Sequence, residues 1–317
     1  MKIKGLKTFS KFLLFTCLFV ILICFFLFMF ALDSNDVKTD NNDPIINIFE
    51  EKESFDLGRE VKEIEKTKKE EKDEEKIIRP ILNGNIRFMS YNIKAGWGLK
   101  LNEVIEVVKM NNVDVLAVQE IDVNTDRSAD INVDTGRVER TNQVEKIEDE
   151  LGMYGYFFKA IEYDGGDYGI ALFSVLPLVA RSGSFYLNQP EDGENVYQTA
   201  EINLDGISLF LCNTHLSTDQ SVCLKQMDEL SEMLEKKQND IIVFGDFNNS
   251  KNVLEVFDSF HSDGALGNTY PADFPKAKID YILYSPSLEK LHSEIISNEE
   301  AKFASDHLPI LVDLKIK

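Results

Sequence analysis

The segment IIVFGDFNNS at residues 241–250 joins an apolar run to a polar cluster. Its first four residues are all apolar, which indicates a buried strand covered on both faces. Asp246 and Asn248 follow at the end of this strand, directly after Gly245. A carboxylate and an amide in this position suit a hard, oxygen-liganded cation and a proton acceptor. The segment therefore predicts a buried sheet with polar, potentially reactive groups at one edge.

The same transition recurs at five other apolar runs between residues 83 and 317. Each run begins or ends at an acid, an amide or an imidazole: 86–91 before Asn92, 113–118 before Gln119 and Glu120, 207–212 before Asn213 and His215, 279–284 around Asp280, and 308–314 after Asp306 and His307. One such junction carries little information, because every strand must end in something polar. Six of them predict that these side chains converge on a single rim.

Two weaker strands are expected at residues 170–173 and 197–203, between stretches with helical periodicity. Apolar residues at three- and four-residue spacing predict helices over 101–108, 144–151 and 224–234; Leu224, Met227, Leu230 and Leu234 form the apolar positions of the last. Strands interleaved with helices in this way predict a sheet packed with helices, an α/β or α+β domain.

Six blocks carry a resemblance to a known family. They are MSYNI (89–93), DVLAVQEID (114–122), LCNTHLS (211–217), VFGDFNNS (243–250), IDYIL (279–283) and SDHLPILVDL (305–314). In this order and spacing, residues 85–316 resemble the endonuclease/exonuclease/phosphatase superfamily of DNase I-like metal-dependent phosphoesterases. The resemblance implies a four-layer α/β/β/α sandwich with its site at one end of the sheets. It also implies hydrolysis of phosphodiester or phosphomonoester bonds by water with Mg²⁺, or alternatively Mn²⁺.

The resemblance further implies a role for each polar residue. Glu120 is expected to be the principal Mg²⁺ ligand, with Asn92 and Asp306 as further metal-site residues. Asp246 is expected to orient or deprotonate the attacking water, and Asn248 to hold a phosphoryl oxygen.

Two histidines complete the implied set. His307 is expected to contact the phosphate or transfer a proton, with Asp280 fixing its tautomer, and His215 to be the general acid for the leaving oxygen. Arg127 lies where a subset of bacterial members carries an arginine and is a candidate substrate contact, as is Tyr168 in the cleft. Val175 departs from the family, since many relatives have an arginine there.

Each residue also has an ordinary structural interpretation. Asn92, Asp246 and Asn248 could be turn or capping residues, and Asp280, Asp306 and Arg127 could be surface charges. The joint occurrence of the six blocks favours the functional interpretation. A binding module that keeps the fold without catalysis is a second hypothesis, and a membrane scaffold acting through its charged stalk is a third.

The N-terminus has a different character from the rest of the chain. Residues 12–32 form an uncharged apolar run long enough for a helix that spans a bilayer, and residues 1–11 carry four lysines. The positive-inside rule puts residues 1–11 in the cytoplasm and the remainder outside it, in a single-pass protein of the cell membrane. A secreted protein with a cleaved signal peptide is the alternative, and a buried core helix is disfavoured at this length. The highly charged residues 33–82 are expected to be a stalk, either disordered or helical, before the domain at 83–317.

Charge and cysteine content narrow the function classes. The net charge is −21, so binding of nucleic acid or anionic lipid through a broad positively charged surface is not expected. The expected membrane anchor and the acidic domain together favour a lipid headgroup or small phosphodiester over duplex DNA, as in sphingomyelinases or phosphoinositide phosphatases. An extracellular DNase-like nuclease stays open as the alternative, and no protein partner is implied. Four cysteines are too few for a disulfide scaffold, and Cys212 and Cys223 could be either bonded or free.

Overall fold

The computed structural model describes residues 84–96, 100–131, 138–189 and 193–316. Among these residues no helix has the length and apolarity needed to cross a bilayer. The predicted segments 1–11, 12–32 and 33–82 lie outside the described residues, so the membrane anchor and the stalk stay predictions.

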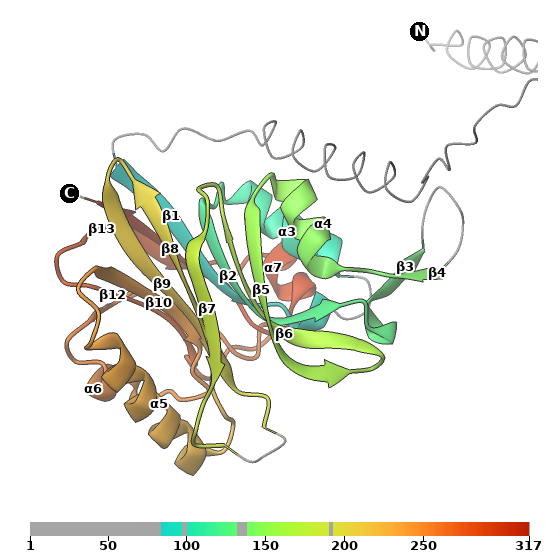
Figure 1. Cartoon of the computed structure of the whole chain (residues 1–317). Coiled ribbons are helices and arrows are strands. Elements are labelled where there is room, and N and C mark those ends of the chain that lie inside the picture. Colours follow the sequence, from blue (N-terminus) through green and yellow to red (C-terminus); the bar gives the residue numbers. More distant parts are fainter. Residues whose placement is uncertain (1–83, 97–99, 132–137, 190–192, 317) are drawn as a thin grey trace, which may run out of the picture. The chain divides into compact units, whose positions relative to one another are not determined.

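Two six-stranded mixed sheets form the described domain (Figure 1). The first sheet has the order β13-β14-β1-β2-β6-β5, with bounds Glu289–Ile295, Ile310–Lys315, Asn85–Asn92, Val115–Val123, Gly166–Ser174 and Tyr154–Tyr163. The second has the order β11-β12-β10-β9-β8-β7, with bounds His261–Ser262, Asp280–Tyr284, Asp240–Asp246, Ile207–His215, Val196–Leu204 and Val179–Phe185. A short ribbon pairs β3 (Ala129–Ile131) with β4 (Val138–Arg140). In each large sheet one central pair is parallel, β1 with β2 and β9 with β10, and the other pairs are antiparallel.

Three large apolar clusters hold the layers together, besides a small fourth one around Ile170. The middle cluster joins the facing sides of the two sheets and includes Phe88 and Phe244, whose rings tilt against each other at 5.9 Å. A second cluster packs α3 (Leu101–Met110), α4 (Gln143–Leu151) and α7 (Glu299–Ala304) on the outer face of the first sheet. A third packs α5 (Gln220–Leu234) and α6 (Val253–Val256) on the second sheet. Figure 1 shows the two sheets stacked face to face, with these helix groups on opposite sides.

The predicted mixed architecture of sheets and helices is confirmed. All eight predicted strands and all three predicted helices are present within a few residues of their expected bounds. The edge strands β5, β7, β11 and β13 were not predicted, because their residues are largely half-buried or exposed and show no long apolar run. The assignment of Leu224 to the apolar face of α5 is wrong: its neighbours Met227 and Leu230 are buried, but Leu224 is 37% exposed.

Cys212 and Cys223 are free and buried. Burial raises the pKa of each thiol to about 12, so neither is a reactive thiolate at neutral pH. The disulfide alternative is therefore not realised in the described domain.

Candidate active site

A cleft of about 540 Å³ opens where the parallel strands of both sheets end. The carboxyl ends of parallel strands meet at one edge of a sheet, so β1 and β2 deliver Asn92 and Glu120 together, and β9 and β10 deliver His215 and Asp246. The lining includes residues from both sheets and the loops between them: Glu120, Arg127, Ile161, Tyr163, Tyr168, Glu194, Asn195, His215, Leu216, Ser217, Thr218, Asp246, Asn248, Tyr270, Ile279, Asp306 and His307.

Glu120 enters the cleft through an irregularity in β2. The pairing with β6 shifts register between Gln119 and Ile121, and Glu120 at this bulge has a left-handed backbone with φ 57°. A bulge re-aims a side chain that a regular strand would direct elsewhere, and such strain in a non-glycine residue is concentrated at functional positions. Asn92 Nδ2 then donates a 2.9 Å hydrogen bond to Glu120 Oε1.

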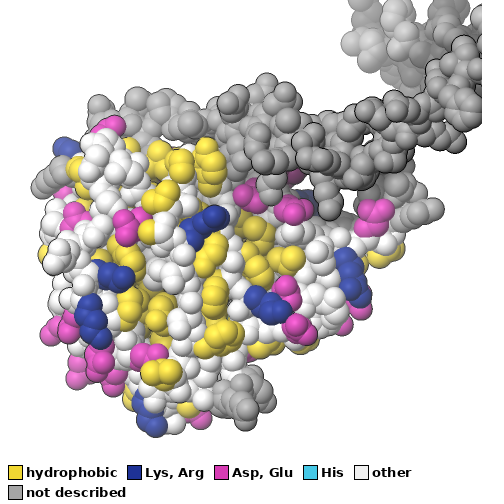
Figure 2. Space-filling view, viewed as in Figure 1, with side chains coloured by type: hydrophobic (Ala, Val, Ile, Leu, Met, Phe, Trp, Pro, Cys, Tyr) yellow, Lys and Arg dark blue, Asp and Glu magenta, His cyan; other side chains and the backbone are white. Residues whose placement is uncertain are grey.

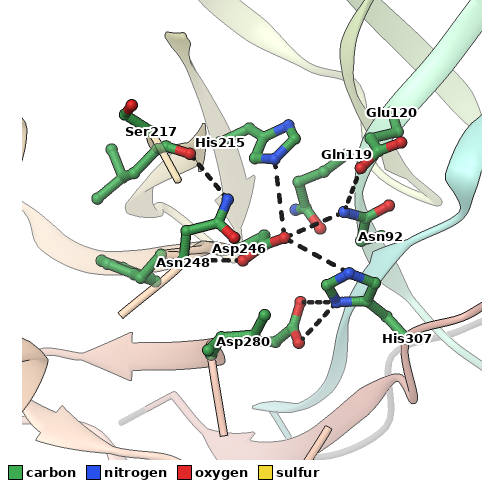
Figure 3. Close-up of polar contacts among 12 residues, drawn as sticks. Asn92, Gln119, Glu120, His215, Ser217, Asp246, Asn248, Asp280 and His307 are labelled. Carbon is green, nitrogen blue, oxygen red and sulfur yellow. Dashed lines mark hydrogen bonds and ion pairs between the residues drawn. The ribbon is translucent and has the colours of Figure 1, made fainter. Parts of the chain in front are cut away.

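The Asn92 amide also joins the two sheets. Its Nδ2 donates a second hydrogen bond, of 3.1 Å, to Asp246 Oδ2 across the sandwich (Figure 3). Asp246 is 1% exposed. Burial, followed by the charge of Asp280, raises the pKa of Asp246 to about 6, while His307, His215 and the Asn248 backbone N–H favour its ionised form. A carboxylate with this pKa is a competent proton acceptor near neutral pH.

His307 and Asp280 form a buried imidazole–carboxylate pair. His307 Nδ1 faces both Asp280 oxygens, at 3.2 and 3.0 Å, and His307 Nε2 lies 3.7 Å from Asp246 Oδ2. Burial disfavours the charged imidazole, but the charge and hydrogen bond of Asp280, with Asp246 and Asp306, outweigh it and raise the pKa of His307 to about 10. His307 can therefore carry a positive charge and present an Nε2–H donor toward Asp246.

His215 and Asn248 complete the group from the second sheet. His215 Nε2 lies 3.7 Å from Asp246 Oδ2, so Asp246 is flanked by two imidazoles. The Asn248 backbone N–H donates to Asp246 Oδ1 at 2.9 Å, and its side-chain amide donates to the Leu216 carbonyl at 2.9 Å. Asn248 also has a left-handed backbone, with φ 48°, and lines the cleft.

This arrangement brings the predicted residues together, and a sequence comparison identifies the family. A model of the endonuclease/exonuclease/phosphatase family matches residues 89–307. The chain belongs to the endonuclease/exonuclease/phosphatase family. A search of curated proteins finds no match.

Solved structures of other family proteins share the fold. One from Bacteroides vulgatus superposes with a TM-score of 0.60 at 16% identity, covering 74% of this chain and 99% of that one. One from Beutenbergia cavernae gives 0.58 at 18% identity, covering 73% and 72%. A mannosyl-6-phosphatase of Bacteroides thetaiotaomicron gives 0.56 at 16% identity, covering 73% and 100%. At these identities the similarity establishes the DNase I-like fold of two mixed sheets with flanking helices.

The residues around Glu120 fit the divalent metal that the family implies. Asn92 donates a hydrogen bond to Glu120 Oε1. Within the described chain, no group donates a hydrogen bond to the other oxygen, Oε2. Glu120 is only half-buried and faces the cleft, so one hard oxygen is open to a cation; Mg²⁺ needs only one or two carboxylates. Asp246, Asp280 and His307 also bring ligand atoms within 4.8 Å of one another. Because a protonated His307 has no lone pair to give, this second cluster suits proton transfer better than metal binding.

Asp306 is held by a lysine. Its Oδ2 lies 2.7 Å from Lys94 Nζ, and Asp306 lines both the cleft and a neighbouring hollow of about 350 Å³. Lys94 follows β1 with a left-handed backbone, φ 49°. The predicted metal role of Asp306 stays a prediction, and a metal would compete with this ion pair.

The structure also assembles cleft residues that were not predicted. The Tyr270 ring lies 4.7 Å from the His307 ring, between centroids, and is part of the cleft wall. Tyr163 packs under the Arg127 guanidinium, 4.2 Å from its ring centre. Neither tyrosine lies in one of the six blocks, and an aromatic residue in a loop or at a strand end carries no distinguishing signal in a single sequence.

Proposed function

We propose that the protein is a metal-dependent phosphoesterase, which cleaves phosphodiester or phosphomonoester bonds by attack of water. The observation that carries this proposal is the Asn92 amide, which hydrogen-bonds both Glu120 and Asp246 beside the His307–Asp280 pair. The Glu120 carboxylate is open to a cation, and the Asp246 carboxylate is buried among hydrogen-bond donors. Membership of a phosphoesterase family and the phosphatase named among the similar structures support the same activity.

Glu120 would hold the metal, with Asn92 fixing its orientation. A bound Mg²⁺ or Mn²⁺ would supply Lewis-acid stabilisation of the phosphate charge. Asp246 is placed to accept a proton from water, because burial raises its pKa to about 6. His307, charged by its contact with Asp280, would donate a hydrogen bond to a phosphoryl oxygen, and His215 would protonate the leaving oxygen.

The cleft supports a small phosphoester in preference to duplex nucleic acid. Its volume lies within the range of small-molecule sites. Four acids line it, Glu120, Glu194, Asp246 and Asp306, whereas Arg127 is the one lysine or arginine among the lining residues given above. On the face shown in Figure 2, described basic side chains are scattered among acidic ones without a continuous basic surface, which a nuclease would use to hold DNA.

The cellular location is a further proposal. Residues 12–32 support a single-pass anchor with the domain outside the cytoplasm. Protease treatment of intact cells should then remove the domain, and protection of the domain until the cells are lysed would contradict this placement.

A substrate panel on the full-length protein tests the activity. It would compare plasmid DNA, RNA, sphingomyelin, phosphoinositides and bis-p-nitrophenyl phosphate, each with Mg²⁺ and with EDTA. We expect hydrolysis of at least one small or lipid phosphoester with Mg²⁺ and none with EDTA. Asp246→Ala should abolish it, whereas Asp258→Ala, at an exposed position, should not. Wild-type rates in Asp246→Ala would refute the assignment.

A further inference from the structure

The bulge that carries Glu120 interrupts the first sheet. β2 and β6 pair regularly up to Gln119, and the register shifts before Ile121. Glu120 itself has a left-handed backbone, which a non-glycine residue adopts only at a cost. Contacts from neighbouring residues must therefore hold this backbone if the Glu120 carboxylate is to keep one position in the cleft.

Asn213 of the second sheet reaches this bulge from the inside of the sandwich. Its Nδ2 donates 3.0 Å hydrogen bonds to the backbone carbonyls of Val118 and Ala171, which pair with each other on β2 and β6. Its Oδ1 accepts a 2.7 Å hydrogen bond from Gln119 Nε2. Asn213 is fully buried, so these hydrogen bonds are shielded from water. One side chain of β9 thus ties β2 and β6 together directly before Glu120.

Gln143 holds the chain on the other side of the bulge, from the helical layer. It lies in the first turn of α4 and is buried. Its Oε1 accepts a 2.9 Å hydrogen bond from the Asp122 backbone N–H, and its Nε2 donates to the Ala95 carbonyl at 2.5 Å. Ala95 lies three residues after Asn92, the hydrogen-bond partner of Glu120. Gln143 therefore joins the segments that follow Asn92 and Glu120.

A bend in the sheet is a second candidate cause of the bulge. β5 and β6 also shift register opposite Gly169, between Lys159 and Ile161. Gly169 lies so close to the Phe158 carbonyl oxygen that an added Cβ would collide with it. The bend accounts for an irregular backbone at this point. It leaves the residues before and after Glu120 free to adjust, however, whereas the two amides hold them.

We propose that Asn213 and Gln143 are positioning residues, which hold the Glu120 bulge from opposite layers and thereby set the affinity for the divalent metal. This inference rests on the proposed function, in which Glu120 holds that metal. Groups that orient a metal ligand without touching the metal change its affinity by about 10- to 100-fold. Neither amide is among the residues that line the cleft, so its effect on the metal must pass through Glu120 or Asn92.

Calorimetric titration of the full-length protein with Mg²⁺ tests the two residues. Asn213→Leu removes the hydrogen bonds from the inside of the sandwich with little change in volume, and Gln143→Met removes those from the helical layer. Each variant keeps the Glu120 carboxylate but should weaken Mg²⁺ binding about 10-fold, because the carboxylate loses its fixed position. Should Asn213→Leu fail to fold, Gln143→Met decides the question alone.

Tyr186→Phe is the matched control. The Tyr186 hydroxyl shares a buried 2.6 Å hydrogen bond with Thr214 Oγ1, next to Asn213 on β9, and Tyr186 packs in the cluster between the second sheet and its helices. This variant loses a buried hydrogen bond away from the bulge, so its Mg²⁺ affinity should equal that of the wild type. Equal affinities in Asn213→Leu, Gln143→Met and this control would overturn the proposal and leave the bend at Gly169 as the cause of the bulge.

Hydrogen exchange in EDTA distinguishes this failure from failure of the proposed function. If the wild type binds no Mg²⁺, the metal role of Glu120 is wrong, and backbone exchange then tests whether the amides hold the bulge. In Asn213→Leu, exchange should become several-fold faster over residues 118–122 and 167–171 but not over β14. Exchange that is unchanged, or faster by the same factor in β14, would overturn the positioning role.

Discussion

The two sheets are built alike but contribute different chemistry. Both contain a parallel pair flanked by antiparallel strands, β14-β1-β2-β6 in the first and β12-β10-β9-β8 in the second. In the first sheet β1 ends at Asn92, and Glu120 lies at the bulge of β2, directly after the last parallel partner, Gln119. In the second sheet β9 and β10 end at His215 and Asp246. Equivalent topology thus delivers one polar pair from each side to the same cleft.

The difference lies in backbone regularity and burial. β2 is bulged at Glu120, whose side chain is half-buried and keeps one free oxygen, whereas β10 pairs regularly with both neighbours up to the buried Asp246. The open carboxylate keeps the hydration and access that a cation needs. The buried carboxylate has a raised pKa, which proton transfer needs. The proposed metal ligand and the proposed base therefore come from similar strand pairs.

Among the variants that test this comparison, the largest effect should follow from loss of His307, whose imidazole faces Asp246, the proposed base on the second sheet. His307→Gln keeps a hydrogen-bonding side chain but removes the charge held by Asp280. We expect kcat to fall about 10³-fold, the scale of lost proton transfer and charge stabilisation. Steady-state hydrolysis with Mg²⁺ would measure it, with the exposed His292→Gln as control. A loss of less than tenfold would mean that His307 has a structural role only.

A smaller effect is expected from the first sheet, where the quantity that should change is the affinity for Mg²⁺. Glu120→Gln should weaken Mg²⁺ binding roughly tenfold or more, because a neutral amide replaces the open carboxylate. Calorimetric titration of the full-length protein with Mg²⁺ would measure this. Glu194→Gln is the control, since Glu194 also lines the cleft but lies outside the Asn92 network. Equal Mg²⁺ affinities in the two variants would show that Glu120 is not the metal ligand that the first sheet provides.

The buried pair between the sheets should appear in the pH dependence of stability. The pKa of His307 is raised from 6.5 to about 10, so its stabilising contribution is complete below pH 6.5 and is lost as the pH rises toward 10. Urea unfolding in EDTA should therefore show the wild type losing more stability over this range than His307→Gln. The difference should be on the order of 3 kcal/mol. Parallel pH profiles would show that Asp280 does not hold a charged imidazole.

Much of this site could be predicted from strand ends alone. Asn92, Glu120, His215, Asp246 and His307 each follow or precede an apolar run, and buried strands leave a clear apolar signal. Parallel pairing then brings the ends together. The helices were found for the same reason, apart from Leu224, because an apolar residue at the right spacing can still lie at the border of the buried face.

Other features depend on contacts that a local pattern does not encode. The ion pair of Lys94 with Asp306 joins residues separated by more than two hundred positions, and the stacking of Tyr270 on His307 depends on a loop path. Exposed edge strands such as β7 show little alternation of apolar and polar residues, because neither face of the strand is fully covered. The paired hydrogen bonds from Arg127 to Asp122 join residues that are close in the chain. The sequence alone nevertheless did not decide whether Arg127 makes a salt bridge or a substrate contact. The structure shows the salt bridge, and Arg127 also lines the cleft.

The smallest predicted effect concerns the bulge that distinguishes the two sheets. Glu120 has φ 57°, a conformation that costs a non-glycine residue about 1 kcal/mol or more. Glu120→Gly should relieve this cost and raise the free energy of unfolding by roughly 0.5–1 kcal/mol, while Mg²⁺ binding weakens. Glu120→Ala is the matched control, because it removes the carboxylate but keeps the Cβ strain.

Chemical denaturation of both variants in EDTA separates strain from function. If the Glu120→Gly variant is more stable than the Glu120→Ala variant, the left-handed backbone at position 120 carries a cost. The fold would then retain Glu120 there because its carboxylate is needed in the cleft. If the two are equally stable, the left-handed conformation carries no cost in this bulge. The contrast between the sheets would then rest on burial alone, since Asp246 is reached by a regular strand and needs no such strain.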